Sequence, residues 1–421
     1  MSRSGSFLLT AVLCCSGVLS TAAAQERAGE LGSALLQTPA VKTAVAFART
    51  DQAQTLADQI RICEVEAPPF EEAQRAQLYA QMFRDAGLKN VRTDAEGNVI
   101  GERPGAAPRP NVVMSAHLDT VFPRGTNVKV RREGSVLRGP GISDDCRGLA
   151  DLVAVARALN RAGVTTPGTI TFVGTVGEEG LGDLRGVKRL FNETLKDRID
   201  RFVSIEGAGL GITHVAIGST RFRVTFKGPG GHSFGSFGIV NPVHALGRAM
   251  NRIADFRVPH SPRTTFNVGR IGGGTSINTI SSDAWMEVDL RSGEASALTA
   301  LEKEFRQAVQ EAVTEENARW NSRALTVSIE TVGRRPAGRL PATAPIVRAA
   351  VSVSEALNLP VLFAEGSTDS NLPLSLGIPA VTIDSGGRGE GAHTEAEMFD
   401  ATDAWKGTQR AVLLAVVLAQ P

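Results

Sequence analysis

The sequence predicts an α/β protein whose main sheet is covered by helices on both faces. Four short runs of apolar and β-branched residues are typical of strands buried on both sides, at 112–116, 169–176, 202–205 and 380–383. Between the first two runs, residues 147–162 place leucine, valine and alanine at helical spacing before Gly163. Strands that alternate with helices indicate a three-layer α/β arrangement.

A second pattern interrupts the first from about residue 214. Strand-like runs at 221–226, 264–271, 284–290 and 325–329 enclose two helices. We expect the first helix to begin with Asn241 as N-cap and Pro242 at its first position, and Ser296 to cap the second. The order strand–helix–strand–strand–helix–strand is that of a ferredoxin-like α+β unit.

The two patterns predict how the chain is divided. The α/β pattern resumes after Arg335 with a helix near residues 346–357. We therefore expect one α/β domain formed by residues 40–212 and 336–421, with residues 213–335 inserted as a separate unit of a size that folds independently.

The composition is that of an ordinary globular protein. The chain has 421 residues, of which 42% are hydrophobic and 21% charged, so collagen-like, coiled-coil and largely disordered structures are excluded. Lys+Arg number 45 and Asp+Glu 44, for a formal net charge of +1. This balance does not indicate a surface for nucleic acid or for an anionic membrane.

The first 24 residues resemble a signal peptide. Arg3 provides the positive charge, residues 7–19 an apolar stretch, and Ala22 to Ala24 a cleavage site before Gln25. The stretch is shorter than the ~20 apolar residues that span a bilayer. A lipoprotein is the weaker alternative, because bulky residues precede Cys14 and Cys15. We expect an exported protein, periplasmic or secreted, with no membrane span after cleavage.

Acids and histidines follow the predicted strands of the main sheet. In an open α/β sheet, ligands bind at the carboxyl ends of the strands, so these side chains are expected to meet there. They are His117 and Asp119, Asp144 and Asp145 before the predicted helix, Glu178 and Glu179, Glu206, and His393 in a Gly-rich loop near the C-terminus.

A buried cluster of acids requires compensating cations. Asp144, Glu179 and Glu206 carry three negative charges, and a bridging hydroxide would add a fourth, which two divalent ions would balance. Imidazole and carboxylate ligands suit zinc, with cobalt or manganese as substitutes.

Each residue of the cluster has an expected role. Asp144 would bridge the ions, His117 and Glu206 would complete one ligand shell, and Glu179 and His393 the other. Asp119 would accept the second imidazole proton of His117. Glu178 would remain free as the general base for a water shared between the ions. A protein without metal that only binds a partner is an alternative, although every expected ligand position is filled.

These motifs resemble those of the co-catalytic dinuclear zinc exopeptidases that include peptidase T, carboxypeptidase G and aminoacylase. The segments SAHLDTVFP, GISDDCRG, GTVGEEG and GAHTEAE are similar to the family's metal and base motifs. The resemblance implies the ligand roles given above, a cis peptide after Asp144, and an inserted lid and dimerisation domain. Cys146-Arg147 replaces the family's usual Lys-Gly, and Glu206 is typical of aminoacylase relatives rather than of peptidase T relatives, which usually have Asp.

Further matches fall in the inserted unit. GPGGHSF resembles a motif in which the histidine, here His232, polarises the scissile carbonyl, often across a dimer. GGTSINTI and DLRS imply that Asn278 and Arg291 bind the substrate carboxylate. Arginine suits that task because its guanidinium forms two parallel hydrogen bonds to a carboxylate. The resemblance is compatible with a homodimer formed through the lid, and the sequence leaves the oligomeric state open.

The sequence as a whole predicts an exported dinuclear zinc metallopeptidase. It would act as an exopeptidase on short peptides, tripeptidase- or carboxypeptidase-like, cleaving an amide bond near a free carboxylate with the metal-bridged water. The alternative within the same family is an N-acyl-amino-acid deacylase, which Glu206 favours.

Signal cleavage would leave two cysteines, Cys63 and Cys146. An oxidising compartment could join them in a disulfide beside Asp144. Two separate thiols, buried or adjacent to the metal, are the alternative reading.

Overall fold

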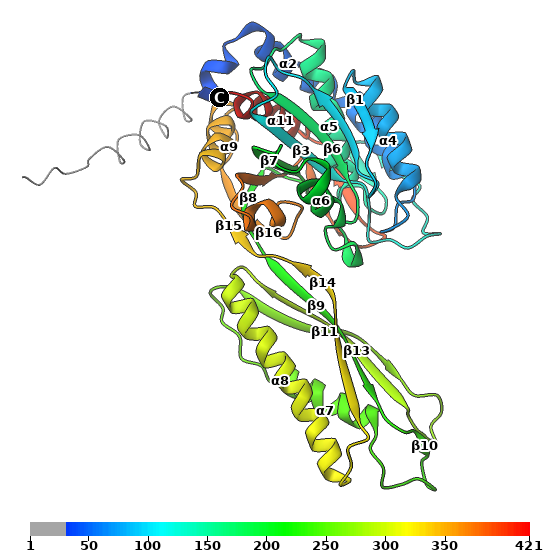
Figure 1. Ribbon diagram of the computed structural model, residues 1–421. Coiled ribbons are helices and arrows are strands. Elements are labelled where there is room, and N and C mark those ends of the chain that lie inside the picture. The colour runs from blue at the N-terminus through cyan, green and yellow to red at the C-terminus, as the bar shows by residue number, and fades with distance from the viewer. Residues whose placement is uncertain (1–30) are drawn as a thin grey trace, which may run out of the picture.

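The computed structural model describes residues 31–421, so the predicted signal peptide lies outside the described residues. The chain forms a large main unit and a smaller inserted unit, the lid (residues 218–335), which projects from it (Figure 1). The chain enters the lid through β9 (Gly218–Lys227) and leaves it through β14 (Thr326–Arg335).

A nine-stranded sheet forms the centre of the main unit. Its path is β1-β2-β6-β3-β7-β17-β8-β15, and β16 also pairs with β8. The four runs predicted as buried strands are the parallel strands at its centre, β6, β3, β7 and β17. The bounds are β1 Lys89–Thr93, β2 Val99–Arg103, β3 Asn111–His117, β6 Thr169–Thr175, β7 Arg201–Ile205, β8 Gly211–Ala216, β15 Gly338–Arg339, β16 Leu362–Gly366 and β17 Ala380–Ile383.

Helices cover both faces of this sheet, which confirms the predicted three-layer α/β fold. One face packs against long helices in a single hydrophobic core. The other face carries short helices and a π-helical turn (190–194), with a second core around Phe202 and Leu190. The long helices are α2 Pro39–Thr50, α3 Gln52–Cys63, α4 Ala73–Asp85, α5 Cys146–Arg161, α9 Pro345–Ala356 and α11 Trp405–Leu418; the short ones are α6 Arg185–Arg189 and α10 Asn371–Ser375.

The lid has its own sheet and its own core. Its four antiparallel strands have the order β11-β13-β9-β14, which is the ferredoxin-like order, and two helices cover one face. Alternate residues of β9 and β13 are buried, as in a sheet with one face on a core. The remaining elements are α7 Pro242–Ala254, β11 Thr264–Gly273, β13 Asp283–Ser292 and α8 Ala295–Arg319, with a small ribbon of β10 Gly231–His232 and β12 Thr279–Ile280 at the free end.

A third, small sheet lies beside the main one. Its strands have the order β18-β19-β5-β4, and the loop between β18 and β19 carries His393. The bounds are β4 Arg131–Glu133, β5 Val136–Arg138, β18 Arg388–Glu390 and β19 Met398–Asp400.

The predicted N-cap residue is right for one lid helix and wrong for the other. The Asn241 side chain accepts a hydrogen bond from Val243 N at 3.0 Å, so the predicted N-cap is confirmed. The second helix begins at Ala295, and Glu294 rather than Ser296 occupies its N-cap position, without a side-chain cap. The boundary expected after residue 212 falls inside β8, which pairs in the main sheet, so the first part of the main unit extends to residue 217.

The apolar run near the C-terminus forms part of α11, which packs in the main core. Within residues 31–421, no helix combines the length and the apolar character needed to cross a membrane.

Because each unit has a separate core, a cavity in the lid should destabilise the lid alone. Phe305 is fully buried and stacks on Phe222 with ring centroids 4.9 Å apart. We expect Phe305→Ala to lower the stability of the lid by about 3–5 kcal/mol, measured as lost protection from hydrogen exchange in residues 218–335. Phe172→Ala, equally buried in the main core, is the matched control and should affect the main unit instead. Equal losses in both units from Phe305→Ala would contradict this separation.

Candidate functional site

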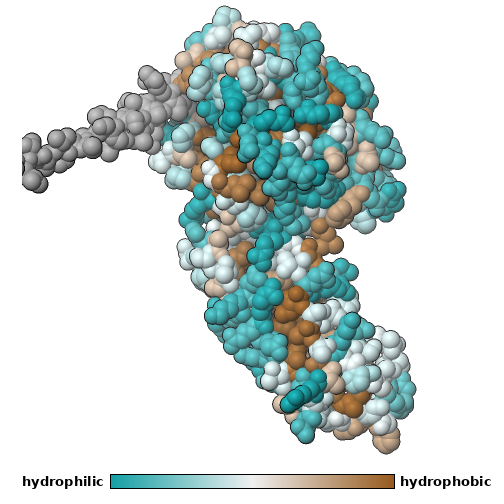
Figure 2. Space-filling view, viewed as in Figure 1, coloured by the Kyte–Doolittle hydropathy of each residue, from teal (hydrophilic) through white to brown (hydrophobic). Residues whose placement is uncertain are grey.

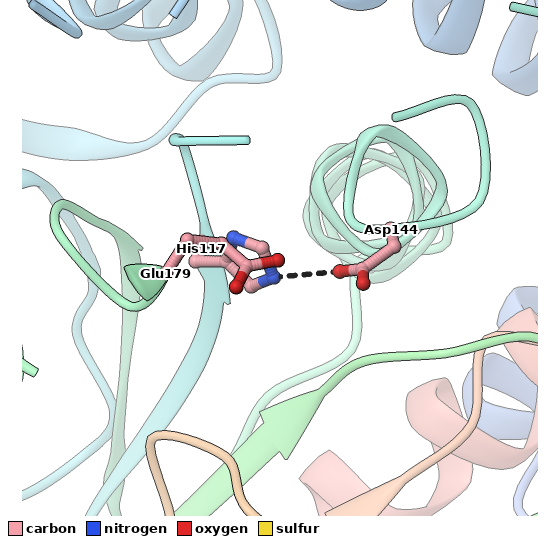
Figure 3. Close-up of side chains that lie close together, drawn as sticks. All are labelled: His117, Asp144 and Glu179. Carbon is pink, nitrogen blue, oxygen red and sulfur yellow. Dashed lines mark hydrogen bonds and ion pairs between the residues drawn. The ribbon is translucent and has the colours of Figure 1, made fainter. Parts of the chain in front are cut away.

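The ends of three main-unit elements bring His117, Asp144 and Glu179 together (Figure 3). His117 is the last residue of β3, Asp144 lies just before α5, and Glu179 follows β6. One ligand atom from each lies within 4.8 Å of the others. The His117 Nε2 atom is 3.0 Å from Asp144 Oδ1.

His393 and Glu206 complete this cluster from two further elements. The His393 Nε2 atom is 3.1 Å from Asp144 Oδ2 and 2.9 Å from Glu179 Oε1. Glu206 follows β7 and forms a second group with His117 and Glu178, whose ligand atoms also lie within 4.8 Å of one another. All five residues expected to hold metal therefore lie around one point. Asp144 is central, because its two oxygens face different histidines.

The Asp119 carboxylate has a different position from the one expected. His117 Nδ1 lies 3.0 Å from the main-chain oxygen of Asp119, closer than the 3.7 Å to its Oδ1. The carboxylate oxygens accept hydrogen bonds from the main-chain N–H groups of Glu178 and Glu179, at 3.0 and 2.7 Å. Asp119 thus orients the imidazole through its backbone and holds the paired glutamates through its side chain.

The peptide bond between Asp144 and Asp145 is cis, as the resemblance implied. Asp145 is buried, and its carboxylate accepts hydrogen bonds from His117 N at 3.0 Å and from Gly148 N at 3.1 Å. The second acid of the pair therefore caps α5 and fixes the end of β3.

Sequence reasoning missed Glu397, a fully buried acid behind Asp144. Its carboxylate accepts hydrogen bonds from Gly141 N, Ser143 N, Ser143 Oγ and Asp144 N, at 2.7–3.0 Å. It therefore shapes the loop that presents Asp144. A signal was present in the sequence, because Glu397 closes the same GAHTEAE segment that contains His393.

Arg335 is the second residue that sequence reasoning missed. It is buried at the end of β14, and its Nη1 donates to Glu178 Oε1 at 2.6 Å, while Nη2 donates to the Glu178 main-chain oxygen. Burial raises the pKa of Glu178 to about 8, the charge of Arg335 opposes that shift, and Glu179 adds to it. The candidate base is thus paired with a cation from the lid.

Burial and neighbouring charges also shift the pKa values of the other groups in the cluster. Burial raises the pKa of Glu206 well above its usual value, and the charge of Glu178 adds to the effect. Burial acts against charge on His117, but its hydrogen bond to Asp144 and the surrounding acids raise its pKa well above the usual range. Hydrogen bonds to Asp144 and Glu179 raise the pKa of His393 to about 10. For Asp144, hydrogen bonds from both histidines outweigh burial and lower the pKa.

The three lid residues that were predicted to bind the substrate, His232, Asn278 and Arg291, do not lie together at this cluster. His232 and Asn278 lie together at the free end of the lid, where β10 pairs with β12 and Ser233 N donates to Asn278 O at 2.9 Å (Figure 1). Arg291 lies at the other end of β13, where its Nε is 2.6 Å from Asp289 Oδ2. β13 separates them because an extended strand rises about 3.3 Å per residue.

The two cysteines are free thiols in this structure, so the hypothesis of a disulfide is not supported. Both are buried and interact with each other, and the Cys63 Sγ donates to Pro140 O at 3.3 Å. Cys146 begins α5, directly after the Asp144–Asp145 pair. The two cysteines are therefore buried thiols close to the expected metal ligands, as the alternative prediction states.

A cavity of about 240 Å³ opens beside Asp144 and Glu206. Its walls are small residues and the loop after β18, including Gly207, Ala208 and Gly391. The space is large enough for a small side chain or acyl group and adjoins the acids directly.

Comparison with known proteins agrees with this geometry. The model of peptidase family M20/M25/M40 matches residues 113–416. An uncharacterised protein of Bacillus subtilis, YqjE, is 23% identical over 385 residues, covering 86% of this chain and 98% of its own length.

Two solved structures share the fold. Aminopeptidase PepT from Bacillus cereus superimposes with a TM-score of 0.69 at 21% identity, over 88% of this chain and 99% of its own. YXEP of Bacillus subtilis, described as a dinuclear metal binding peptidase from the M20 family, gives 0.65 at 17% identity, over 88% and 99%. The matched region contains β3 from residue 113 onward, β6, β7, α5 and the loop of His393, and so every residue of the cluster. The chain therefore belongs to peptidase family M20/M25/M40, as a metal-dependent hydrolase of peptide bonds.

Proposed function

We propose that the protein is an exported exopeptidase that hydrolyses short peptides next to a free carboxylate, with two divalent ions, most readily zinc. The observation that carries the proposal is the position of Asp144. Its Oδ1 and Oδ2 atoms lie 3.0 and 3.1 Å from the histidines His117 and His393, as expected of a carboxylate that bridges two ions. Export rests on the N-terminal segment of the sequence.

The residues present fit two cations. Glu206 Oε2 is buried without a hydrogen-bond partner among residues 31–421, which is costly unless a cation occupies the space before it. Burial raises the pKa values of Glu206 and Glu178, which disfavours their charged forms unless a cation compensates them. The donors are imidazole nitrogens and carboxylate oxygens, a set that suits zinc and also accepts cobalt or manganese.

Each residue then has a defined task. His117 and Glu206 would hold one ion, Glu179 and His393 the other, and Asp144 both. When bound, the ions supply Lewis acidity that activates water and polarises the scissile carbonyl. Glu178 lies in the second group of candidate ligands, with His117 and Glu206. Neither of the proposed shells uses it as a ligand, so it would take a proton and deliver it to the leaving nitrogen.

We propose that a second copy of the chain completes the site through the lid. His232 and Asn278 are too far along the lid to reach the cluster of their own chain, although their types suit carbonyl and carboxylate binding. Figure 2 shows apolar surface on the lid. Large apolar side chains are exposed next to His232 and Asn278: Phe234 at 89%, Ile277 at 102% and Phe237 at 77%. Such side chains are typical of a surface that another chain covers.

A substitution at the base tests the proposed chemistry. Glu178→Gln should keep two ions per chain and lower kcat by about 10³-fold or more, because the amide cannot accept the proton. Ion content is measured by elemental analysis and kcat with di- and tripeptides, with zinc, cobalt and manganese in turn. Glu355→Gln, a change on the surface of α9, is the control and should leave both values unchanged. Normal cleavage by Glu178→Gln would refute the assignment of the base.

The same assay separates the two substrate classes. N-acetyl amino acids are tested beside the peptides, because Glu206 favours the deacylase alternative. Faster turnover of the acetylated amino acids would replace the peptidase proposal with the deacylase and leave the roles of the residues intact.

Mixing two inactive variants tests the dimer. Glu178→Gln and His232→Ala each disable a different part of the site, so a mixed dimer would contain one intact site. After unfolding and refolding an equal mixture, we expect about a quarter of the wild-type activity to return. Each variant refolded alone is the control. No recovery in a mixture shown by native mass spectrometry to contain mixed dimers would refute completion of the site by the partner.

The protonation of the cluster predicts how the metal-free protein responds to pH. Glu178 has its pKa raised from 4.5 to about 8, so its contribution to stability is complete below about pH 4.5 and is lost as the pH rises through 8. His393, raised from 6.5 to about 10, loses its contribution as the pH rises toward 10. We expect the Tm of the metal-free protein to fall by several degrees between pH 6 and pH 9, and the fall to be smaller with zinc bound. Equal falls in both forms would contradict the assigned protonation.

A further inference from the structure

The segment from Glu178 to Asp183 (the base loop) carries two residues of the metal cluster and also contacts the strands through which the chain enters and leaves the lid. It begins with the candidate base and the ligand Glu179, and it ends at Asp183, where the lid strands β9 and β14 approach the main unit (Figure 1). The lid can therefore act on the base directly at this point.

The strand that leaves the lid is bonded to both ends of the base loop. At one end Arg335 donates to the Glu178 carboxylate at 2.6 Å and to the Glu178 main-chain oxygen. At the other end the Arg334 N–H donates to Asp183 Oδ1 at 2.7 Å. β14 thus holds the base and the end of its loop at once.

The strand that enters the lid contacts the middle of the loop. Arg221 of β9 donates through Nη1 to the main-chain oxygen of Gly180, and its Nε is 3.3 Å from Asp289 Oδ1 in β13. Both lid strands are therefore bonded to the same six-residue segment, which extends the lid sheet to the metal cluster.

Asp183 is held in an unusual conformation by these contacts. Its φ of 51° and that of Leu184, 60°, lie in the left-handed region that residues other than glycine seldom adopt. The Lys188 Nζ lies 2.6 Å from Asp183 Oδ2 and 3.2 Å from the Arg334 main-chain oxygen, so one lysine joins Asp183 to β14. Such backbone strain persists where surrounding contacts enforce it, and it is common at functional sites.

We propose that Asp183 is a positioning residue that couples the orientation of the lid to the position of Glu178. A rotation of the lid about β9 and β14 moves Arg334, Arg335 and Arg221, and through them it moves the base loop. An error of about 1 Å in a reacting group can lower the rate by about 10²-fold. The inference rests on the proposed role of Glu178 and adds that the lid sets the place of this carboxylate.

Three variants test the coupling. Asp183→Gly removes every side-chain contact but accepts the positive φ without strain, so the chain should still fold. Asp183→Asn also tolerates this φ and keeps an acceptor for Arg334 N, but it loses the charge that pairs with Lys188. Asp403→Gly is the matched control, since Asp403 has a φ of 57° and a lysine partner, Lys406, at 2.7 Å, on the surface before α11.

The variants are compared in the full chain loaded with zinc. We expect Asp183→Gly to lower kcat by about tenfold or more with little change in KM, Asp183→Asn to lie between it and the wild type, and Asp403→Gly to match the wild type. Spin-labelled unnatural amino acids at Gln74 and Lys303, both exposed, report the distance between main unit and lid. This distribution should broaden in Asp183→Gly, broaden less in Asp183→Asn, and stay unchanged in Asp403→Gly. An unchanged kcat, or a reduced kcat with an unchanged distribution, would overturn the coupling.

A further readout keeps this test independent of the proposed reaction. If the wild type cleaves neither peptides nor acetylated amino acids, the proposed function fails. The label distances and the visible spectrum of the cobalt-loaded chain still test whether Asp183 links the lid to the loop of Glu179. A spectrum and a distribution that are the same in Asp183→Gly and in the wild type would overturn that link.

Discussion

The structure depends on a concentration of acidic side chains where the central strands of the main sheet end. Asp144 and Glu179 form one group with His117, and Glu178 and Glu206 form a second group with the same histidine. His393 contacts Asp144 and Glu179. Burying this much negative charge is unfavourable unless cations or protons compensate it. Without cations, the chain compensates the charge by retaining protons, as the raised pKa values of Glu206 and His393 indicate. Two divalent ions would compensate the same charge and would also fix the positions of the side chains that bind them.

The surrounding structure holds these groups in place. Three further carboxylates support the expected ligands without being needed as ligands themselves. Each accepts a hydrogen bond from the main-chain N–H of a ligand residue; they are Asp119, Asp145 and Glu397. Each of these carboxylates is buried and satisfied by at least two donors. Such supporting contacts orient metal ligands, and the loss of one typically lowers metal affinity or activity by about 10- to 100-fold.

The lid contributes a different kind of element. It has its own core, separate from that of the main unit, and its strands contact the base loop at their ends. Arg335 and Arg221 extend from the lid to the base loop, whereas His232 and Asn278 lie at the opposite end. The lid therefore has two regions for which we propose a function: one that contacts the candidate base of its own chain, and one at its free end that would complete the site of another copy.

The sequence by itself determined the family, the α/β class with its ferredoxin-like insertion, and the residue types that meet at the sheet edge. Those conclusions followed from local patterns, because strand ends and turn motifs can be read from consecutive residues. Only the tertiary structure showed that Glu397 and Arg335 support Asp144 and Glu178, that the Asp119 carboxylate binds main-chain N–H groups, and that the cysteines are free. It also separated Asn278 from Arg291 along the length of β13. These facts arise from contacts between segments as far as about 250 residues apart, and no local pattern encodes which distant side chain approaches which loop.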